Sequence, residues 1–286
     1  MKRWPLQLGV EPLYSDNESA VYVGDCFSVP VPQIDLLLVD TPYSPKTHKG
    51  HNAGVKQTSA GKRGDTFHGG ESKRTAALGR RKLNYPSWKP DDVRRFVDLW
   101  VPRTRGWVVS VTDNELAPHW ADALEQHKRC VFAPLPFVEF GSRVRLAGDG
   151  PSCITCWIIV ARPRHRPYSR WGTLPGAYVV PPGLGKQRPG EDRVVGDKPA
   201  WLGDRLVLDY SREGDVVCDP CAGSGTFGVS AKRWRRRALL IERDERAAQG
   251  AAKELAATRP LTQIEMRLDV EEMAGEQLKI AGEAAE

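Results

Sequence analysis

The sequence predicts an α/β fold in which a doubly wound, mostly parallel sheet is covered by helices on both faces. Apolar runs rich in Val, Ile and Leu alternate along the 286 residues with segments of helical periodicity. Several of these runs are continuous rather than alternating, which is typical of strands buried on both faces. Hydrophobic residues make up 40% and charged residues 27% of the chain, values that exclude disorder of the whole chain.

Eight apolar runs are expected to form the strands of this sheet. In chain order they cover residues 20–23, 34–39, 107–111, 131–132, 137–140, 154–160, 215–218 and 238–241. Five further segments have the pattern of amphipathic helices. They cover residues 91–100, 115–127, 199–210, 226–236 and 245–257. Pro90 and Pro199 lie at or just before the first turn of their helices, where the missing N–H has no cost.

Two long stretches interrupt this alternation, residues 44–90, rich in Gly, Lys and Arg, and residues 162–197, rich in Pro, Gly and Arg. Between residues 46 and 82, ten basic residues are opposed by two acidic ones, so this segment carries +8 in a chain of net charge +6. Solvated loops are one interpretation, and a nucleic-acid groove is the other. The candidate DNA contacts are Lys46, His48, Lys49, Lys62, Arg63, Arg80, Arg81, Arg166 and Arg170.

The cysteines and histidines are interpreted without a metal. Cys153-Ile-Thr-Cys156 and Cys218-Asp-Pro-Cys221 have the spacing of a tetrahedral zinc site. The first pair begins an apolar strand, in which side chains three residues apart point to opposite faces, and the second belongs to a glycine turn. For His48-Lys-Gly-His51, contact with phosphate is favoured over a metal or a general base. We expect free thiols in a reducing compartment and no metal.

No apolar run has membrane-spanning length, the most apolar being residues 153–161, and the N-terminus lacks the apolar stretch of a signal peptide. We therefore expect a cytoplasmic protein with no membrane partner.

The first chemical signal follows the predicted strand at residues 215–218. Asp219 and Pro220 end this strand, and a turn, Cys-Ala-Gly-Ser-Gly, leads into the next helix. Gly223 and Gly225 let backbone approach a ligand closely, and the helix N-terminus offers free N–H groups. The next strand ends in Glu242, where a carboxylate accepts hydrogen bonds from ribose hydroxyls. A nucleoside-containing cofactor is predicted, although the spacing is neither that of a dinucleotide site nor that of a phosphate-binding loop.

The second signal is Asp40-Thr-Pro-Tyr43, directly after the predicted strand at residues 34–39. This places a carboxylate, a proline-rigidified carbonyl and an aromatic ring at the carboxyl end of a strand. In doubly wound sheets this edge is where ligands bind.

These residues resemble the catalytic Asp-Pro-Pro-Tyr motif of S-adenosylmethionine-dependent DNA amino-methyltransferases, and residues 219–225 resemble their Asp-Pro-Phe-Ala-Gly-Ser-Gly cofactor motif. The catalytic motif comes first, as in the permuted beta class of that family. Gly24-Asp-Cys26 is similar to the element before the catalytic strand, and Asp197-Lys-Pro-Ala-Trp201 resembles the Gln-Lys-Pro segment before the cofactor motif. Thr41 and Cys221 replace a proline and a phenylalanine of the family motifs. No large target-recognition domain is recognisable.

The resemblance implies a Rossmann-like methyltransferase fold with circularly permuted motif order. We expect a single domain at residues 1–264, with a basic insertion at 44–90, a small DNA-recognition region at 162–197 and an acidic tail at 265–286. The implied catalytic residues are Asp40, Thr41, Pro42 and Tyr43. The residues implied to bind S-adenosylmethionine are Asp25, Cys26, Lys198, Pro199, Trp201, Asp219, Pro220, Cys221, Ala222, Gly223, Ser224, Gly225, Thr226 and Glu242.

The expected activity is site-specific methylation of an exocyclic amine on a flipped base of double-stranded DNA. Adenine N6 is favoured over cytosine N4, because an aspartate at the first catalytic position leans toward adenine in this family. Two rival interpretations are a non-catalytic DNA-binding protein on the same fold, which Thr41 would permit, and a methyltransferase acting on RNA or protein. The sequence leaves open a homodimer, a cognate restriction nuclease and the target site.

Overall fold

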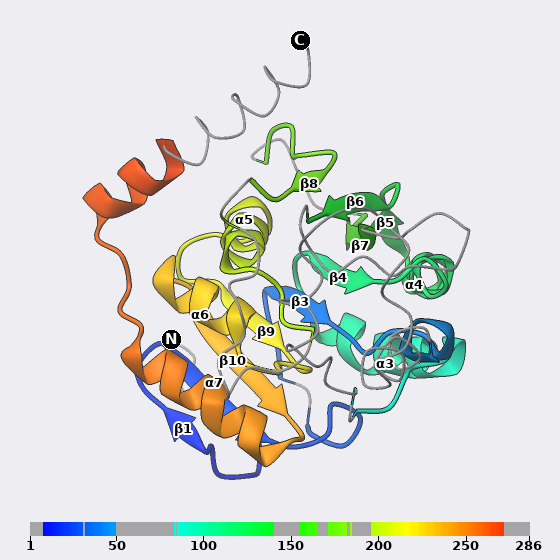
Figure 1. Ribbon diagram of the computed structural model, residues 1–286, viewed down its shortest axis with the longest axis horizontal. Helices are drawn as coiled ribbons and strands as arrows, with labels where there is room; N and C mark the ends of the chain where they lie inside the picture. Colours follow the sequence, from blue (N-terminus) through cyan, green and yellow to red (C-terminus); the bar gives the residue numbers. More distant parts are fainter. Residues whose placement is uncertain are drawn as a thin grey trace, which may run out of the picture.

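The computed structural model describes residues 8–30, 32–49, 83, 85–139, 155–164, 171–181, 184 and 196–271 and contains one sheet of ten strands (Figure 1). The strands are β1 (Tyr14–Ser15), β2 (Ser19–Val23), β3 (Leu36–Asp40), β4 (Val108–Thr112), β5 (Arg129–Val131), β6 (Leu135–Val138), β7 (Thr155–Pro163), β8 (Tyr178–Val179), β9 (Val216–Asp219) and β10 (Arg237–Glu242). The helices are α3 (Pro90–Trp100), η1 (Val101–Arg103, a 3-10 helix), α4 (Ala117–Gln126), α5 (Ala200–Tyr210), α6 (Thr226–Arg233) and α7 (Glu245–Ala257).

The centre of the sheet is parallel. Strands β2, β10, β9, β3 and β4 lie in that order, and each neighbouring pair is parallel. Antiparallel pairing appears toward the edges, where β1 joins β2, β7 joins β4, and β5 and β6 join β7. At the edge beyond β6, β8 pairs with β6 in parallel. The prediction of a doubly wound, mostly parallel sheet is therefore confirmed, with antiparallel pairs on both sides of its parallel centre.

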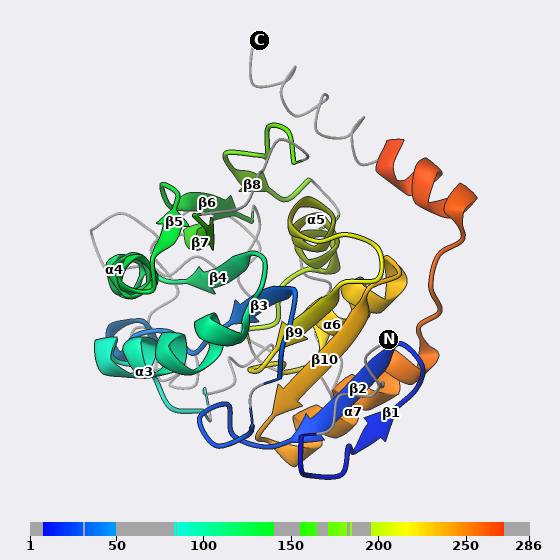
Figure 2. The ribbon, with the colours of Figure 1, turned by 180° about the vertical axis from the view of Figure 1, so that it is seen from behind.

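Each face of the sheet has its own hydrophobic core. Helices α5, α6 and α7 cover one face, and α3 and α4 cover the other (Figures 1 and 2). Along β3, Leu36 and Leu38 pack into the first core, whereas Leu37 and Val39 pack into the second. Because successive side chains of a strand point to opposite faces, a strand between two cores is apolar at every position. This explains the continuous apolar run from which this strand was predicted.

Most differences from the predicted elements lie at their ends. Asp40, Asp219 and Glu242 are the last residues of β3, β9 and β10 rather than the residues that follow them. Helix α6 ends at Arg233, before the predicted residue 236, because the chain turns through Arg235, whose φ is +63°. Strands β1 and β8 have two residues each, too short to leave a periodic pattern.

Two short helical segments fall in stretches predicted as a loop and a tail. Residues 45–49 are helical at the start of the basic insertion. Residues 263–271 form a helix that crosses the predicted domain boundary at 264. Arg233 links this helix to the domain, because its guanidinium pairs with Asp269 at 2.6 Å and with Asp204 of α5 at 3.0 Å.

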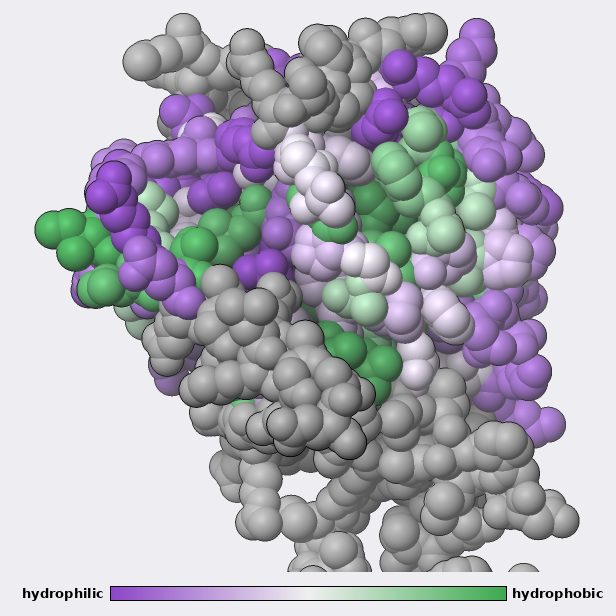
Figure 3. Space-filling model, turned by 90° about the horizontal axis from the view of Figure 1, so that it is seen from above, coloured by the Kyte–Doolittle hydropathy of each residue, from purple (hydrophilic) through white to green (hydrophobic). Residues whose placement is uncertain are grey.

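In the view from above, the apolar areas of the described residues are interrupted by hydrophilic side chains (Figure 3). The helix at residues 263–271 carries three exposed large apolar side chains, Ile264, Leu268 and Val270. In the part of the chain that the structure describes, no helix has the length and hydropathy required to cross a membrane.

Candidate active site

The candidate site lies at the ends of four neighbouring strands, β2, β10, β9 and β3. β3, β9 and β10 end in carboxylates, and because they are parallel, Asp40, Asp219 and Glu242 arrive at the same edge of the sheet. β2 runs parallel to β10 and is followed by Asp25. The parallel pairing of β3 with β9 brings together two motifs that are far apart in the sequence.

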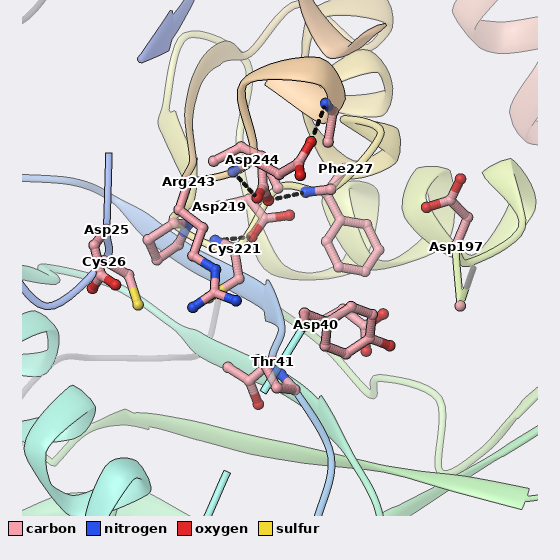
Figure 4. Close-up of a pocket in the computed structure, with 18 of the residues that line it drawn as sticks. Asp25, Cys26, Asp40, Thr41, Asp197, Asp219, Cys221, Phe227, Arg243 and Asp244 are labelled. Carbon is pink, nitrogen blue, oxygen red and sulfur yellow. Dashed lines mark hydrogen bonds between the residues drawn. The ribbon is translucent and has the colours of Figure 1, made fainter. Parts of the chain in front are cut away.

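A cavity of about 620 Å³ opens at this edge (Figure 4). Most of the predicted site residues line it. The predicted residues in its wall are Asp25, Cys26, Asp40, Thr41, Pro42, Tyr43, Lys198, Asp219, Pro220, Cys221, Ala222, Gly223, Thr226 and Glu242. The cavity is thus shared by the predicted catalytic and cofactor motifs.

Four residues predicted to bind the cofactor lie outside the cavity wall. Trp201 is buried in the hydrophobic core on the face of α5, and Pro199 begins that helix as its N-cap. Gly225 is the N-cap of α6 with a φ of +86°. Ser224 lies beside the hydroxyl of Thr226, 3.5 Å from it. These four residues lie in or beside the helices behind the cavity, and their contact with a cofactor stays a prediction.

About half of the residues in the cavity wall were not predicted from the sequence. These residues are Gly24, Phe27, Tyr85, Pro86, Trp88, Gly196, Asp197, Phe227, Arg243, Asp244, Arg246 and Ala247. Several are chain neighbours of predicted residues, and adjacency would have found them. Tyr85, Pro86 and Trp88 have no such signal, because they lie at the end of the basic insertion. The backbone N–H of Trp88 donates to the carbonyl of Tyr43 at 3.0 Å, which holds this segment against the catalytic motif.

The carboxylates of the predicted cofactor half are held by backbone N–H groups. Glu242 accepts one hydrogen bond from Gly223 and one from Asp244, both at 2.8 Å. Asp219 accepts from the N–H of Cys221 at 3.0 Å, and Asp25 accepts from that of Phe27 at 2.8 Å. Asp219 is therefore held by the loop that follows its own strand, whereas Glu242 is held both by the loop after β10 and by the turn after the neighbouring strand β9.

The cavity is acidic. Six of its lining residues are carboxylic acids, Asp25, Asp40, Asp197, Asp219, Glu242 and Asp244, and three are basic, Lys198, Arg243 and Arg246. Burial raises the pKa of Asp219 well above its usual value, and the neighbouring charges of Asp40 and Glu242 raise it further. An acidic, partly buried cavity favours a cationic ligand and disfavours a diphosphate.

The catalytic motif forms a compact polar group with two residues from distant parts of the chain. The ammonium of Lys198 donates a hydrogen bond to Oδ2 of Asp40 and lies 5.2 Å from the centre of the Tyr43 ring. The Tyr43 hydroxyl donates to Sγ of Cys156 at 3.3 Å. Burial raises the pKa of Tyr43 well above its usual value, and the charge of Asp40 adds to this effect, so its phenol stays neutral.

Three of the nine predicted DNA contacts lie within the described residues. Lys46 is exposed and pairs with Glu115 at 2.6 Å, and Lys49 is exposed. His48 is buried, with its ring edge-on to that of Tyr85 and the two ring centres 5.2 Å apart. The remaining candidates, Lys62, Arg63, Arg80, Arg81, Arg166 and Arg170, lie outside the described residues.

The cysteine pairs do not assemble in the described part of the chain. Cys218 is buried within β9, Cys221 lines the cavity, and Cys153 lies outside the described residues. No cluster of three or more His, Cys, Asp or Glu residues that could hold a metal occurs in the described ranges.

Sequence comparisons match the cofactor half of the chain. Residues 183–254 match the family described as DNA methylase. The Type II methyltransferase M2.DpnII of Streptococcus pneumoniae is 43% identical over 60 residues, which are 21% of this chain and 22% of that protein. The Type II methyltransferase M2.LlaDCHI of Lactococcus lactis subsp. cremoris is 38% identical over 58 residues, 20% of this chain and 22% of that protein. The matched segments thus span about a fifth of these relatives.

Solved structures match most of the chain at low identity. The M1.HpyAVI–SAM complex aligns with 83% of this chain and 98% of its own, with a TM-score of 0.53 and 17% identity. PvuII DNA methyltransferase, described as cytosine-N4-specific, aligns with 87% of this chain and 90% of its own, with a TM-score of 0.59 and 12% identity. These likenesses confirm the predicted Rossmann-like methyltransferase fold, and the sequence matches confirm the predicted resemblance to DNA amino-methyltransferases.

Proposed function

We propose that this chain is an S-adenosylmethionine-dependent DNA amino-methyltransferase that acts on adenine N6. The observation that carries the proposal is the shared cavity, in which the Asp40–Tyr43 motif faces the Asp219–Gly223 turn and Glu242. One wall of this cavity fits a nucleoside cofactor, and the other fits an amine acceptor of its methyl group.

The residues present fit S-adenosylmethionine. Glu242 is fixed at the end of β10, where a carboxylate can accept hydrogen bonds from ribose hydroxyls. Helix α6 begins directly after the Gly223 turn. The excess of carboxylates complements a ligand whose sulfur is positively charged. Asp25, Asp219 and Glu242 would hold the cofactor, which when bound supplies an electrophilic methyl group.

The catalytic motif supplies the groups that activate an exocyclic amine. Such an amine delocalises its lone pair into the ring, and it becomes nucleophilic when acceptors draw its hydrogens out of the ring plane. The carboxylate of Asp40 and the backbone carbonyl of Thr41 or Pro42 are these acceptors. The neutral ring of Tyr43, held through its hydroxyl by Cys156, would stack on the flipped base.

The preference for adenine rests on the family resemblance of Asp40 and not on a contact in the structure. The substrate DNA is supported by the DNA methylase match and by the resemblance to relatives named as Type II methyltransferases. Methylation of cytosine N4 would keep the whole mechanism and change only the base.

Calorimetric titration separates the two halves of the site. We expect S-adenosylmethionine to bind the wild type, and NAD and ATP to give no measurable heat because the cavity is acidic. Asp40→Ala should retain cofactor binding and lose methyl transfer to DNA, whereas the control Asp98→Ala, an exposed residue paired with His127, should retain both. Absence of S-adenosylmethionine binding by the wild type would overturn the proposal.

A further inference from the structure

Lys198 contacts the catalytic motif through its charged end. The family resemblance assigns this lysine to the methionine end of the cofactor, yet its ammonium donates to Asp40, 158 residues away in the sequence. We propose that Lys198 is a positioning residue that holds the Asp40 carboxylate in the orientation that the target amine requires. The inference rests on the proposed function, and it assigns to Lys198 a role in the acceptor half of the site.

The ammonium of Lys198 is enclosed by its partners. Its side chain is only 7% exposed. Besides Oδ2 of Asp40, it contacts the carbonyl oxygen of Gly196 at 3.3 Å and the face of the Tyr43 ring at 5.2 Å. Two of these contacts are hydrogen bonds, and the third places the cation over the electron-rich face of an aromatic ring. Lys198 is therefore held in one place rather than extended into solvent.

Asp40 depends on this one contact. In the part of the chain that the structure describes, Lys198 is the only hydrogen-bond donor to its carboxylate, and Oδ1 is buried without a partner. A carboxylate has about four acceptor positions, so the bond from Lys198 leaves room for a hydrogen of the target amine. Lys198 thus fixes the rotation of the carboxylate without filling its acceptor capacity.

The surrounding charges require a cation at this point. Asp40 shares the cavity with Asp197 from the same segment as Lys198, Asp219 from β9 and Glu242 from β10, and Tyr43, Tyr85 and Cys156 also face the pair. Burial lowers the pKa of Lys198, but the charges of Asp40, Cys156 and Asp197 together with the hydrogen bond to Asp40 outweigh it, so the pKa is raised and the lysine stays charged. The charge of Lys198 in turn lowers the pKa of the neighbouring Asp219. Without this cation, Asp219 would take up a proton at higher pH, and the charge of the cavity would change.

Two other roles for Lys198 make different predictions. If it only anchors the cofactor, its replacement raises the dissociation constant of S-adenosylmethionine and spares the turnover rate at saturation. If it only stabilises the fold, its replacement lowers the melting temperature and leaves the rate and its pH dependence unchanged. If Lys198 has the proposed role, its replacement lowers the turnover rate at saturating cofactor and moves the acidic limb of the pH profile of that rate.

Lys198→Met and Lys198→Arg test these roles, with Lys232→Met as a matched control. Lys232 is an equally buried lysine, 6% exposed, that pairs with Asp16 at 2.6 Å and does not line the cavity. We expect Lys198→Met to lower kcat about 100-fold at saturating cofactor, with a nearly unchanged cofactor dissociation constant by calorimetry. The acidic limb of its pH profile should move to higher pH. Lys198→Arg should recover part of kcat and restore the limb, and Lys232→Met should change neither.

A raised dissociation constant with unchanged kcat at saturation, or an unmoved acidic limb, would overturn the proposal. A second measurement is independent of activity and of cofactor. Melting temperatures of the free protein are compared for Lys198→Met, Asp40→Asn and the double variant. Because removal of either partner leaves the other buried alone, we expect the double variant to lose less than the sum of the single losses.

Additive losses would show that the pair does not exist in solution and would overturn the proposal even for an active enzyme. If the wild type transfers no methyl group to DNA, the proposed function fails instead, and non-additive losses would still establish the buried pair. The two failures are thus distinguishable.

Discussion

Glu242 is the residue that links the two loops of the proposed cofactor half of the site. It ends β10 and accepts backbone hydrogen bonds from both the Gly223 turn and the loop at Asp244. One carboxylate therefore joins two loops and still has acceptor positions free for ribose hydroxyls. The residue could be predicted because the end of a parallel strand is a fixed place in this fold.

The first prediction concerns this carboxylate. Glu242→Gln keeps the size of the side chain but turns one acceptor oxygen into a donor that faces a backbone N–H. Because a hydrogen bond to a charged group contributes about 1.5–3 kcal/mol, we expect the dissociation constant of S-adenosylmethionine to rise roughly 10- to 100-fold. Calorimetry measures it, with Glu213→Gln, an exposed partner of Arg235, as the control. Equal affinities of the two variants would refute the role of Glu242.

At the scale of elements, the β9–α6 turn depends on a glycine that does not touch the cavity. Gly225 has a φ of +86°, and a Cβ added there would lie 2.8 Å from Cβ of Ala251 in α7. The turn therefore requires both the left-handed backbone and the close approach of α7. Its place in the motif reflects packing behind the site, whereas Gly223, with a φ of +53°, lines the cavity itself.

Gly225→Ala should destabilise the protein. We expect the free energy of unfolding to fall by about 1–3 kcal/mol, since a non-glycine residue in a strained backbone region costs that much even before the contact with Ala251. Denaturant unfolding measures the loss. Gly250→Ala is the matched control, because this glycine lies within α7 with nothing within 4 Å of an added Cβ. It should leave stability unchanged or slightly raised, and an equal loss in both variants would contradict the packing role.

Asp113 fixes the start of the basic insertion to the sheet. It follows β4, is buried, and accepts hydrogen bonds from the N–H of Ser44 at 2.9 Å and from its hydroxyl at 2.6 Å. Burial alone raises the pKa of Asp113, but the hydrogen bonds from Ser44 and Thr47 outweigh it and hold the pKa below its ordinary value of 3.8. The chain just after the catalytic motif is anchored in this way.

This lowered pKa predicts a pH dependence. The contribution of Asp113 to stability is complete above its ordinary pKa and is lost as the pH falls through the lower folded value. We expect Asp113→Asn to lower the free energy of unfolding by about 1–3 kcal/mol at neutral pH and by less below pH 3.8. Unfolding measured from pH 7 to pH 3 checks this difference. A loss that does not shrink toward acid pH would mean that the charge of Asp113 contributes nothing.

At the scale of the whole molecule, the residues at strand ends could be predicted from the sequence, but contacts between segments that are far apart in the sequence could not. Asp40, Asp219 and Glu242 follow apolar runs, and a parallel sheet places all such ends at one edge. Trp88 reaches the cavity by pairing with the backbone of Tyr43 across the insertion, which no local pattern records. Trp201 was predicted to contact the cofactor, whereas the structure buries it in the hydrophobic core beside α5, because an aromatic residue next to a motif fits a ligand contact and a core position equally well.

Lys198 shows the same limit more sharply. The motif predicted that Lys198 lies at the site, and Lys198 lines the cavity. The motif did not indicate whether its ammonium contacts the cofactor motif or the Asp40 motif. The answer depends on where the segment before α5 passes β3, a tertiary feature with no trace in spacing or composition.

The most direct measurement follows a labelled methyl group from S-adenosylmethionine into mixed-sequence duplex DNA, with digestion to nucleosides and mass spectrometry. We expect labelled N6-methyladenine with the wild type and none with Asp40→Ala. Labelled N4-methylcytosine would keep the mechanism and contradict the assignment of the base. DNA that is bound but never labelled would contradict the central claim, and the protein would then be a DNA-binding protein on a methyltransferase fold.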